Sequence, residues 1–196
     1  MNIENFLSKT VMLIDTNFLN EQINLTLNFY KNLYPNKIFE KIQLDNLLYN
    51  FARYVDFREA DRNVAVIFAY GIDQSGLLSH CEPNNLLDFI DIHQVQMQTD
   101  LCRFNIRSYF GAEDETCCEH FVHLLKEVMY KRMVSRIIVI ADCYELNYEL
   151  RMMNEEDKEK IILFRKRDTE ITVVPISYGY IDYPLARALG LKGGEI

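Results

Sequence analysis

Four short segments of the chain consist almost entirely of apolar residues. They span residues 10–15, 63–70, 136–142 and 170–176, and two of them end in an aspartate. Apolar runs of this length, without alternating polar positions, are typical of strands that are buried on both faces of a parallel sheet. We therefore predict a parallel strand at each of these four positions.

Between these segments, apolar residues recur at the three- and four-residue spacing of amphipathic helices. Residues 93–110 differ, because their apolar and polar side chains alternate, as in a strand or hairpin with one solvated face. Residues 71–85 are rich in Gly, Ser, Asn and Pro, which indicates a loop. Helices are predicted over residues 17–33, 42–55, 114–133, 145–152, 154–167 and 182–189.

The alternation of strands and helices predicts an α/β fold, a sandwich with a central, mostly parallel sheet. A length of 196 residues and a hydrophobic content of 49% suit one domain with a sizeable core. We assign residues 1–190 to this domain and expect residues 191–196 to form a flexible tail.

The formal net charge of −8 limits the partners that this chain can bind. Such a surface repels phosphate backbones and anionic membranes unless basic residues gather in one place. No segment approaches the roughly 18 apolar residues that span a bilayer, and the N-terminus has no signal-peptide pattern. We expect no membrane partner, and the sequence leaves a homo-oligomer open. Candidates for a local basic rim are Lys131, Arg132, Arg136, Lys166 and Arg167.

The chain has five cysteines, an odd number, and they form no CxxC pair. This pattern predicts reduced thiols and a cytoplasmic location. Cys143 directly follows Asp142 and precedes a predicted helix. A helix N-terminus would favour its thiolate, but the neighbouring acids oppose it, so we expect a small packing residue.

Two aspartates end predicted strands, Asp15 after the first and Asp142 after the third. Sites in open α/β sheets lie at the carboxyl ends of the strands, so the two carboxylates could meet there. Two carboxylates that lie close together repel each other unless one is protonated, a cation lies between them or water solvates them. Mg²⁺ and Mn²⁺ are cations that bind oxygen ligands. Asn17, Glu145 and Asp114 could complete the site. The alternative is structural, because an Asp at a strand end often caps the following helix.

A second group of polar residues lies in CCEHFVH, residues 117–123. Glu119 and His123 share a helix face, and His120 lies three residues before His123. Paired ligands of this kind hold zinc in some proteins, but no third ligand completes a zinc motif here. We favour a solvated pair of Glu119 and His123.

The run VMLIDTN, residues 11–17, resembles the first strand of the NYN branch of PIN-like nucleases. In that family an Asp ends the strand and an Asn follows two residues later. Residues 63–73, 102–115, 136–146 and 170–180 resemble the later strands and turns of the same family, so the likeness extends over about residues 8–190.

The resemblance implies a three-layer, Rossmann-like sandwich of the PIN-like kind. It also implies a cluster of acids that binds Mg²⁺ or Mn²⁺ and hydrolyses RNA. By position, Asp15, Asp142 and Asp114 would be the catalytic metal ligands, and Asn17 would contact the substrate.

The sequence departs from the family at two positions. Tyr144 stands where the family has a second Asp, with Glu145 as a possible substitute, and an acid expected on the long helix falls near His120. The first hypothesis is therefore a metal-dependent phosphodiesterase acting on RNA, with a site that has lost part of its acids. The alternatives are a non-catalytic PIN-like binding or assembly module and a small-molecule α/β enzyme that uses the same sheet edge.

Overall fold

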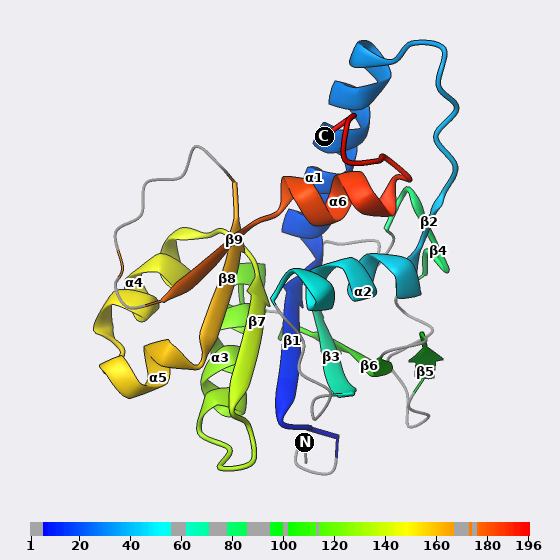
Figure 1. Ribbon diagram of the computed structural model, residues 1–196. Coiled ribbons are helices and arrows are strands. Elements are labelled where there is room, and N and C mark those ends of the chain that lie inside the picture. Colours follow the sequence, from blue (N-terminus) through cyan, green and yellow to red (C-terminus); the bar gives the residue numbers. More distant parts are fainter. Residues whose placement is uncertain are drawn as a thin grey trace.

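A computed structural model of the chain describes residues 6–55, 62–70, 78–85, 95–99, 102–112, 114–166, 173 and 176–196. Within these residues, seven strands form one sheet in the order β5-β6-β3-β1-β7-β8-β9 (Figure 1). The strands of this sheet are β1 (Thr10–Asp15), β3 (Asn63–Tyr70), β5 (Val95–Gln98), β6 (Arg103–Phe110), β7 (Arg136–Ile140), β8 (Ile161–Arg165) and β9 (Ser177–Tyr180). A second sheet pairs β2 (Ile42–Gln43) with β4 (Cys81–Glu82), and the helices are α1 (Thr16–Leu33), α2 (Leu44–Tyr54), α3 (Cys117–Met129), α4 (Tyr144–Met152), α5 (Glu155–Glu159) and α6 (Asp182–Ala188).

The large sheet is parallel except at one edge. β1 pairs in parallel with β3 on one side and with β7 on the other, and all six residues of β1 are buried. β5 pairs antiparallel with β6 and exposes alternate side chains, which confirms the hairpin predicted within residues 93–110. The predicted α/β fold with a mostly parallel sheet is also confirmed, and its layers are consistent with a Rossmann-like sandwich.

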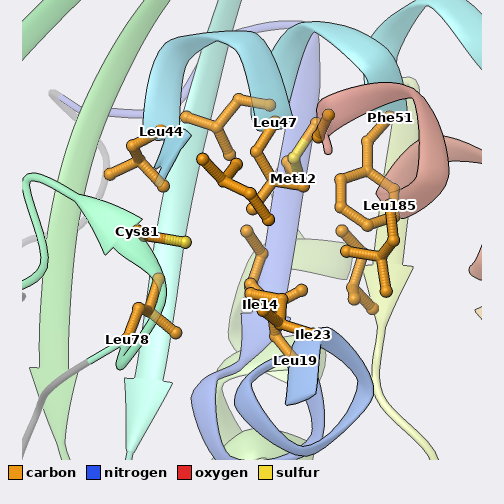
Figure 2. Packing of buried hydrophobic residues seen from close by; sticks show 14 of the residues in the cluster. Met12, Ile14, Leu19, Ile23, Leu44, Leu47, Phe51, Leu78, Cys81 and Leu185 are labelled. Atoms are coloured by element: carbon orange, nitrogen blue, oxygen red, sulfur yellow. The ribbon is translucent and has the colours of Figure 1, made fainter. Parts of the chain in front are cut away.

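Apolar side chains of β1 point alternately to the two faces of the sheet, as the period of a strand requires. Met12 and Ile14 belong to a core shared with α1, α2 and α6, part of which is drawn in Figure 2. Val11 and Leu13 belong to a second core, which is shared with α3 and α4. Two helical layers therefore enclose the sheet, with α2 in front of it and α3 behind it in Figure 1.

The structure corrects the predicted helix over residues 154–167. Of the described residues 154–166, only those of α5 are helical, and the N-cap Asn154 accepts a hydrogen bond from the backbone N–H of Asp157. Ile161 then begins β8, which pairs in parallel with β7. The apolar run that looked like a helix face is a strand, because it completes the buried sheet beyond β7.

At the end of the chain, one predicted strand falls mostly outside the described residues. Of the predicted strand 170–176, only Val173 and Ile176 lie within the described residues; both are buried, and the last described strand is β9. The predicted flexible tail is tied to the domain through Leu191, which is buried, and through an ion pair of 2.5 Å between Lys37 Nζ and Glu195 Oε1. No helix in the described ranges is long and apolar enough to cross a membrane.

Gly179 provides a test of the packing between β8 and β9. It lies opposite the fully buried Phe164, and a Cβ on Gly179 would approach the Phe164 ring to 2.7 Å. The ring cannot withdraw freely because it packs edge-to-face on Phe51. We expect Gly179→Ala to lower the free energy of unfolding by about 1–3 kcal/mol, measured by chemical denaturation. Gly194→Ala is the control, since no atom lies within 4 Å of its added Cβ, and an equal loss in both variants would contradict the prediction.

Candidate functional site

The order in which strands are added to the sheet reverses at β1. The parallel strands that follow β1 in sequence, β3 and β6, lie on one side of it, and the later strands β7, β8 and β9 lie on the other. Open α/β sheets bind ligands outside the carboxyl ends of the strands at such a switch point. Asp15 is the last residue of β1, and Asp142 follows the end of β7 by two residues.

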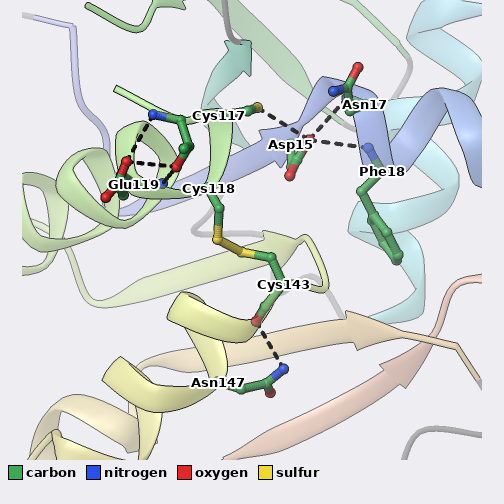
Figure 3. The surroundings of a disulfide bond; sticks show 9 residues. Asp15, Asn17, Phe18, Cys117, Cys118, Glu119, Cys143 and Asn147 are labelled. Carbon is green, nitrogen blue, oxygen red and sulfur yellow. Dashed lines mark hydrogen bonds between the residues drawn. A yellow bond between two sulfur atoms is a disulfide. The ribbon is translucent and has the colours of Figure 1, made fainter. Parts of the chain in front are cut away.

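Asp15 is the N-cap of α1. Its Oδ1 accepts hydrogen bonds from the backbone N–H of Asn17 at 2.9 Å and of Phe18 at 3.1 Å (Figure 3). The thiol of Cys117 on α3 donates to the same oxygen at 3.8 Å. Burial raises the pKa of the Asp15 carboxyl above its ordinary value, and the three hydrogen bonds offset part of that rise. The capping interpretation of Asp15 is therefore correct, and a capping residue can also take part in a site.

The structure brings Asp15, Asn17 and Asp142 together. All three line one open hollow of about 480 Å³ at the carboxyl edge of the sheet. The rest of its lining comes from α1, so that oxygen-bearing side chains dominate the surface; these residues are Phe18, Asn20, Glu21 and Asn24.

Two other predicted site residues lie elsewhere. Asp114 is exposed in the segment before α3 and is not part of the hollow's lining. Glu145 lies in the first turn of α4, where its carboxylate is close to the sulfur atoms of Cys118 and Cys143. Among the described residues, Cys118, Cys143 and Glu145 form the only group of three potential metal ligands whose donor atoms all lie within 4.8 Å of one another. The expected carboxylate trio of Asp15, Asp114 and Asp142 is thus not assembled.

The prediction of reduced thiols is wrong for one pair, because Cys118 and Cys143 form a disulfide (Figure 3). Their Cα atoms are 6.4 Å apart, within the range that a disulfide spans. Cys143 is therefore a cross-link between the end of β7 and the start of α3 rather than a small packing residue. Cys81, Cys102 and Cys117 are not in disulfides.

The predicted Glu119–His123 pair is not the main contact of either residue: hydrogen bonds from Thr116, and to a smaller extent the charge of His123, lower the pKa of the Glu119 carboxyl. Glu119 forms a capping box with Thr116 at the start of α3, and its carboxylate accepts from the Thr116 backbone N–H at 2.9 Å. His123 instead pairs with Glu115, which also contacts His120 Nδ1 at 3.1 Å. The sequence TCCE, residues 116–119, matches the capping-box pattern and was the signal that could have revealed the role of Glu119.

Of the expected basic rim, one residue lies beside the hollow. Lys166 Nζ is 3.7 Å from Glu21 and 5.7 Å from the centre of the Phe18 ring. Lys131 and Arg132 line a different hollow, beyond the end of α3 and before β7 begins. That position is at the opposite edge of the sheet, and Arg167 lies outside the described residues.

The fold and the hollow define an α/β protein with an acidic, oxygen-rich site at the switch point of a mostly parallel sheet. The chain belongs to a family described as a family of unknown function (DUF6621), which matches residues 4–196. Comparison with curated proteins and with solved structures finds no match.

The buried charge of Asp15 predicts a measurable effect on stability. A raised pKa in the folded state means that folding favours the protonated carboxyl, so the charged form costs stability once the pH rises above the ordinary pKa of an aspartate. Asp15→Asn removes this charge, and its amide oxygen still accepts from the N–H groups of Asn17 and Phe18. In the presence of a chelator, we expect a higher Tm than wild type at neutral pH, with the difference shrinking as the pH falls towards 4.

Asp15→Ala is the matched control for the cap. It removes the acceptor as well as the charge, and lost N-caps cost about 1 kcal/mol. Its Tm should lie below that of Asp15→Asn at every pH. An Asn variant that is less stable than wild type at neutral pH would show that the carboxylate contributes more as a hydrogen-bond acceptor than its burial costs.

Proposed function

We propose that the chain is a metal-dependent phosphodiesterase that acts on RNA, a divergent relative of the NYN and PIN-like nucleases. The observation that carries this proposal is the shared hollow of Asp15 and Asp142 at the switch point of the sheet. We further propose a cytoplasmic location, where RNA is available as a partner.

The N-terminus of α1 favours a metal-bridged ligand over a directly bound phosphate. In dinucleotide-binding sheets, a phosphate accepts from the free N–H groups at the start of the helix after the first strand. Here the carboxylate of Asp15 already accepts from the N–H groups of Asn17 and Phe18. A phosphate at this position would meet a negative charge, so a cation has to lie between the two.

The side chains of the hollow suit a hard divalent ion. Mg²⁺ is commonly bound by one or two carboxylates together with waters and substrate phosphates. Every hydrogen bond from a described residue to the Asp15 side chain ends on Oδ1, so Oδ2 is the oxygen that would face an ion. Asp142 would supply the second carboxylate.

A bound Mg²⁺ or Mn²⁺ would polarise the phosphate and activate a water for attack on phosphorus. The chain's own residues supply binding and orientation. The Asn17 amide can hydrogen-bond a phosphate or ribose oxygen, and Lys166 places a positive charge beside an otherwise acidic hollow. Tyr144, which is 81% exposed and lies two residues after Asp142, offers a ring on which an unpaired base can stack.

Two observations favour the alternative, a non-catalytic PIN-like binding or assembly module. Asp114 lies outside the hollow, and Tyr144 replaces an acid that the resemblance leads us to expect. Fewer carboxylates mean weaker binding of an ion, because each offsets part of its charge and dehydration cost. The two functions differ in whether the hollow binds Mn²⁺ and whether bound RNA is cut.

The first prediction for this function concerns cleavage. We expect wild-type protein with Mn²⁺ to cut single-stranded RNA, and Asp142→Asn to lower the rate at least about 100-fold through loss of a metal ligand. The measurement is gel analysis of a labelled oligonucleotide, with Asp45→Asn on α2 as the control that should keep the wild-type rate. Titration calorimetry with Mn²⁺ on the same proteins should show binding by wild type and its loss in Asp142→Asn. Binding of RNA without Mn²⁺ binding or cleavage would favour the non-catalytic module.

The second prediction concerns recognition of RNA. Stacking of a base on an aromatic ring contributes about 1–3 kcal/mol, so Tyr144→Ala should weaken single-stranded RNA binding roughly 5- to 150-fold. Fluorescence anisotropy with Ca²⁺ in place of Mg²⁺ measures affinity while slowing cleavage. Tyr130→Ala is the matched control, because Tyr130 is similarly exposed, at 74%, but lies at the end of α3. Equal affinities of the two variants would remove Tyr144 from the RNA surface.

A further inference from the structure

The disulfide and a neighbouring carboxylate form a compact group at the N-termini of two helices. Cys118 lies in the first turn of α3, Cys143 is the N-cap of α4, and Glu145 lies in the first turn of α4 (Figure 3 shows the two cysteines). One donor atom from each residue lies within 4.8 Å of the other two. This donor set contains two sulfur atoms and one oxygen, unlike the oxygen-rich hollow beside it.

We propose that, in the reduced chain, Cys118, Cys143 and Glu145 bind one Zn²⁺ ion, and that formation of the Cys118–Cys143 disulfide releases it. The group is thus a redox-dependent zinc site. It does not depend on the proposed nuclease function, because it uses different residues and a different class of metal.

The chemistry of the donors selects the metal. Thiolates are soft ligands that favour zinc over magnesium or calcium, and zinc also accepts a carboxylate oxygen. Around a tetrahedral zinc ion, sulfur and oxygen donors lie about 3.3–3.8 Å from one another, given bonds of about 2.0–2.3 Å. In the disulfide the two sulfur atoms are bonded to each other, so reduction has to let them separate to this spacing, and a Glu145 carboxylate oxygen already lies within 4.8 Å of both. Three protein ligands leave the fourth position for a water.

The backbone holds the ligands in place without the disulfide bond. The start of α3 is fixed by the capping box of Thr116 and Glu119, and Cys143 is fixed by the end of the buried strand β7. The carbonyl of Cys143 also accepts from the Asn147 side chain at 3.0 Å within α4. Two thiolates and a carboxylate carry three negative charges, which the ion and the positive ends of the α3 and α4 dipoles offset.

The exchange between the two states is a balanced two-electron step. A dithiol reductant breaks the Sγ–Sγ bond, supplies two electrons and two protons, and itself becomes a cyclic disulfide. The two thiols of the protein then lose their protons as they bind Zn²⁺. In the reverse direction, a small-molecule disulfide takes the two electrons and leaves as two thiolates, which take up two protons from water, while the protein disulfide forms and the ion departs.

The test uses the full chain in its oxidised and reduced forms, freed of metal and of reductant. Zn²⁺ is titrated against a chromophoric chelator, and Co²⁺ is used as a spectroscopic substitute. We expect one zinc per reduced chain, a thiolate-to-cobalt charge-transfer band, and at least about 100-fold weaker binding by the oxidised chain. A reduced wild-type chain that takes up no zinc, or an oxidised chain that binds it equally, would overturn the proposal.

Variants identify the ligands. Cys118→Ser and Cys143→Ser should each weaken zinc binding by at least about 100-fold, and the exposed Glu145→Gln by at least about 10-fold. Cys117→Ser and Glu156→Gln are the matched controls and should bind zinc like wild type. A loss in Cys117→Ser equal to that in Cys118→Ser would show that the assigned ligands are wrong.

A measurement on the unmutated chain covers the case in which a cysteine variant fails to fold. Zn²⁺ should protect Cys118 and Cys143 of the reduced protein from alkylation, while Cys117 should keep its reactivity; mass spectrometry of the peptides reports each position. Equal labelling of Cys118 and Cys143 with and without Zn²⁺ would contradict the site. Because no step measures RNA cleavage, failure here is distinct from failure of the proposed nuclease function.

Discussion

The structure depends on the burial of β1 between two parallel neighbours. Its backbone groups are satisfied by β3 and β7, and its side chains enter a core on each face. Unpaired backbone groups are costly in such an interior, so the register of all three strands is tightly constrained. The same register fixes where the strands end, and this places Asp15 and the segment with Asp142 at one edge.

The position of Asp15 at the end of β1 buries its carboxylate, and burying a charged group is unfavourable. A carboxylate that is 6% exposed would be strongly disfavoured without compensation, and it receives two backbone hydrogen bonds and one from a thiol. The two backbone hydrogen bonds cap the N-terminus of α1, and together with the thiol they fix the orientation of the carboxylate. A position that combines capping with a desolvated charge is the kind of local conflict found at functional sites.

The sequence predicted the parts of the fold that follow from local periodicity. The strands β1, β3 and β7 and the helices α1 and α2 lie close to the predicted positions, because burial on two faces and amphipathic spacing leave direct patterns. β8 was missed because Ile161, Ile162 and Phe164 also fit one helix face, and only pairing with β7 decides between strand and helix. Short apolar runs carry this ambiguity in general.

The sequence likewise predicted only part of the candidate site. The convergence of Asp15 and Asp142 follows from the rule that parallel strands share an edge, but the position of Asp114 depends on how the segment before α3 is oriented. The disulfide had no local signal, since its cysteines are 25 residues apart and meet only because α3 packs against α4, whose N-cap is Cys143. Tertiary contacts of this kind are not encoded in the spacing of the residues that make them.

The extended backbone after β7 connects the two proposed metal sites. Cys143 has φ −141° and ψ 162°, and successive side chains of extended backbone point to opposite sides. Asp142 consequently faces the hollow while Cys143 faces α3. Whatever holds the Cys143 sulfur, a disulfide or a zinc ion, also anchors the segment that carries Asp142. If both proposals hold, the redox state of this cysteine pair also affects the position of the Asp142 carboxylate, because Asp142 directly precedes Cys143 in the backbone.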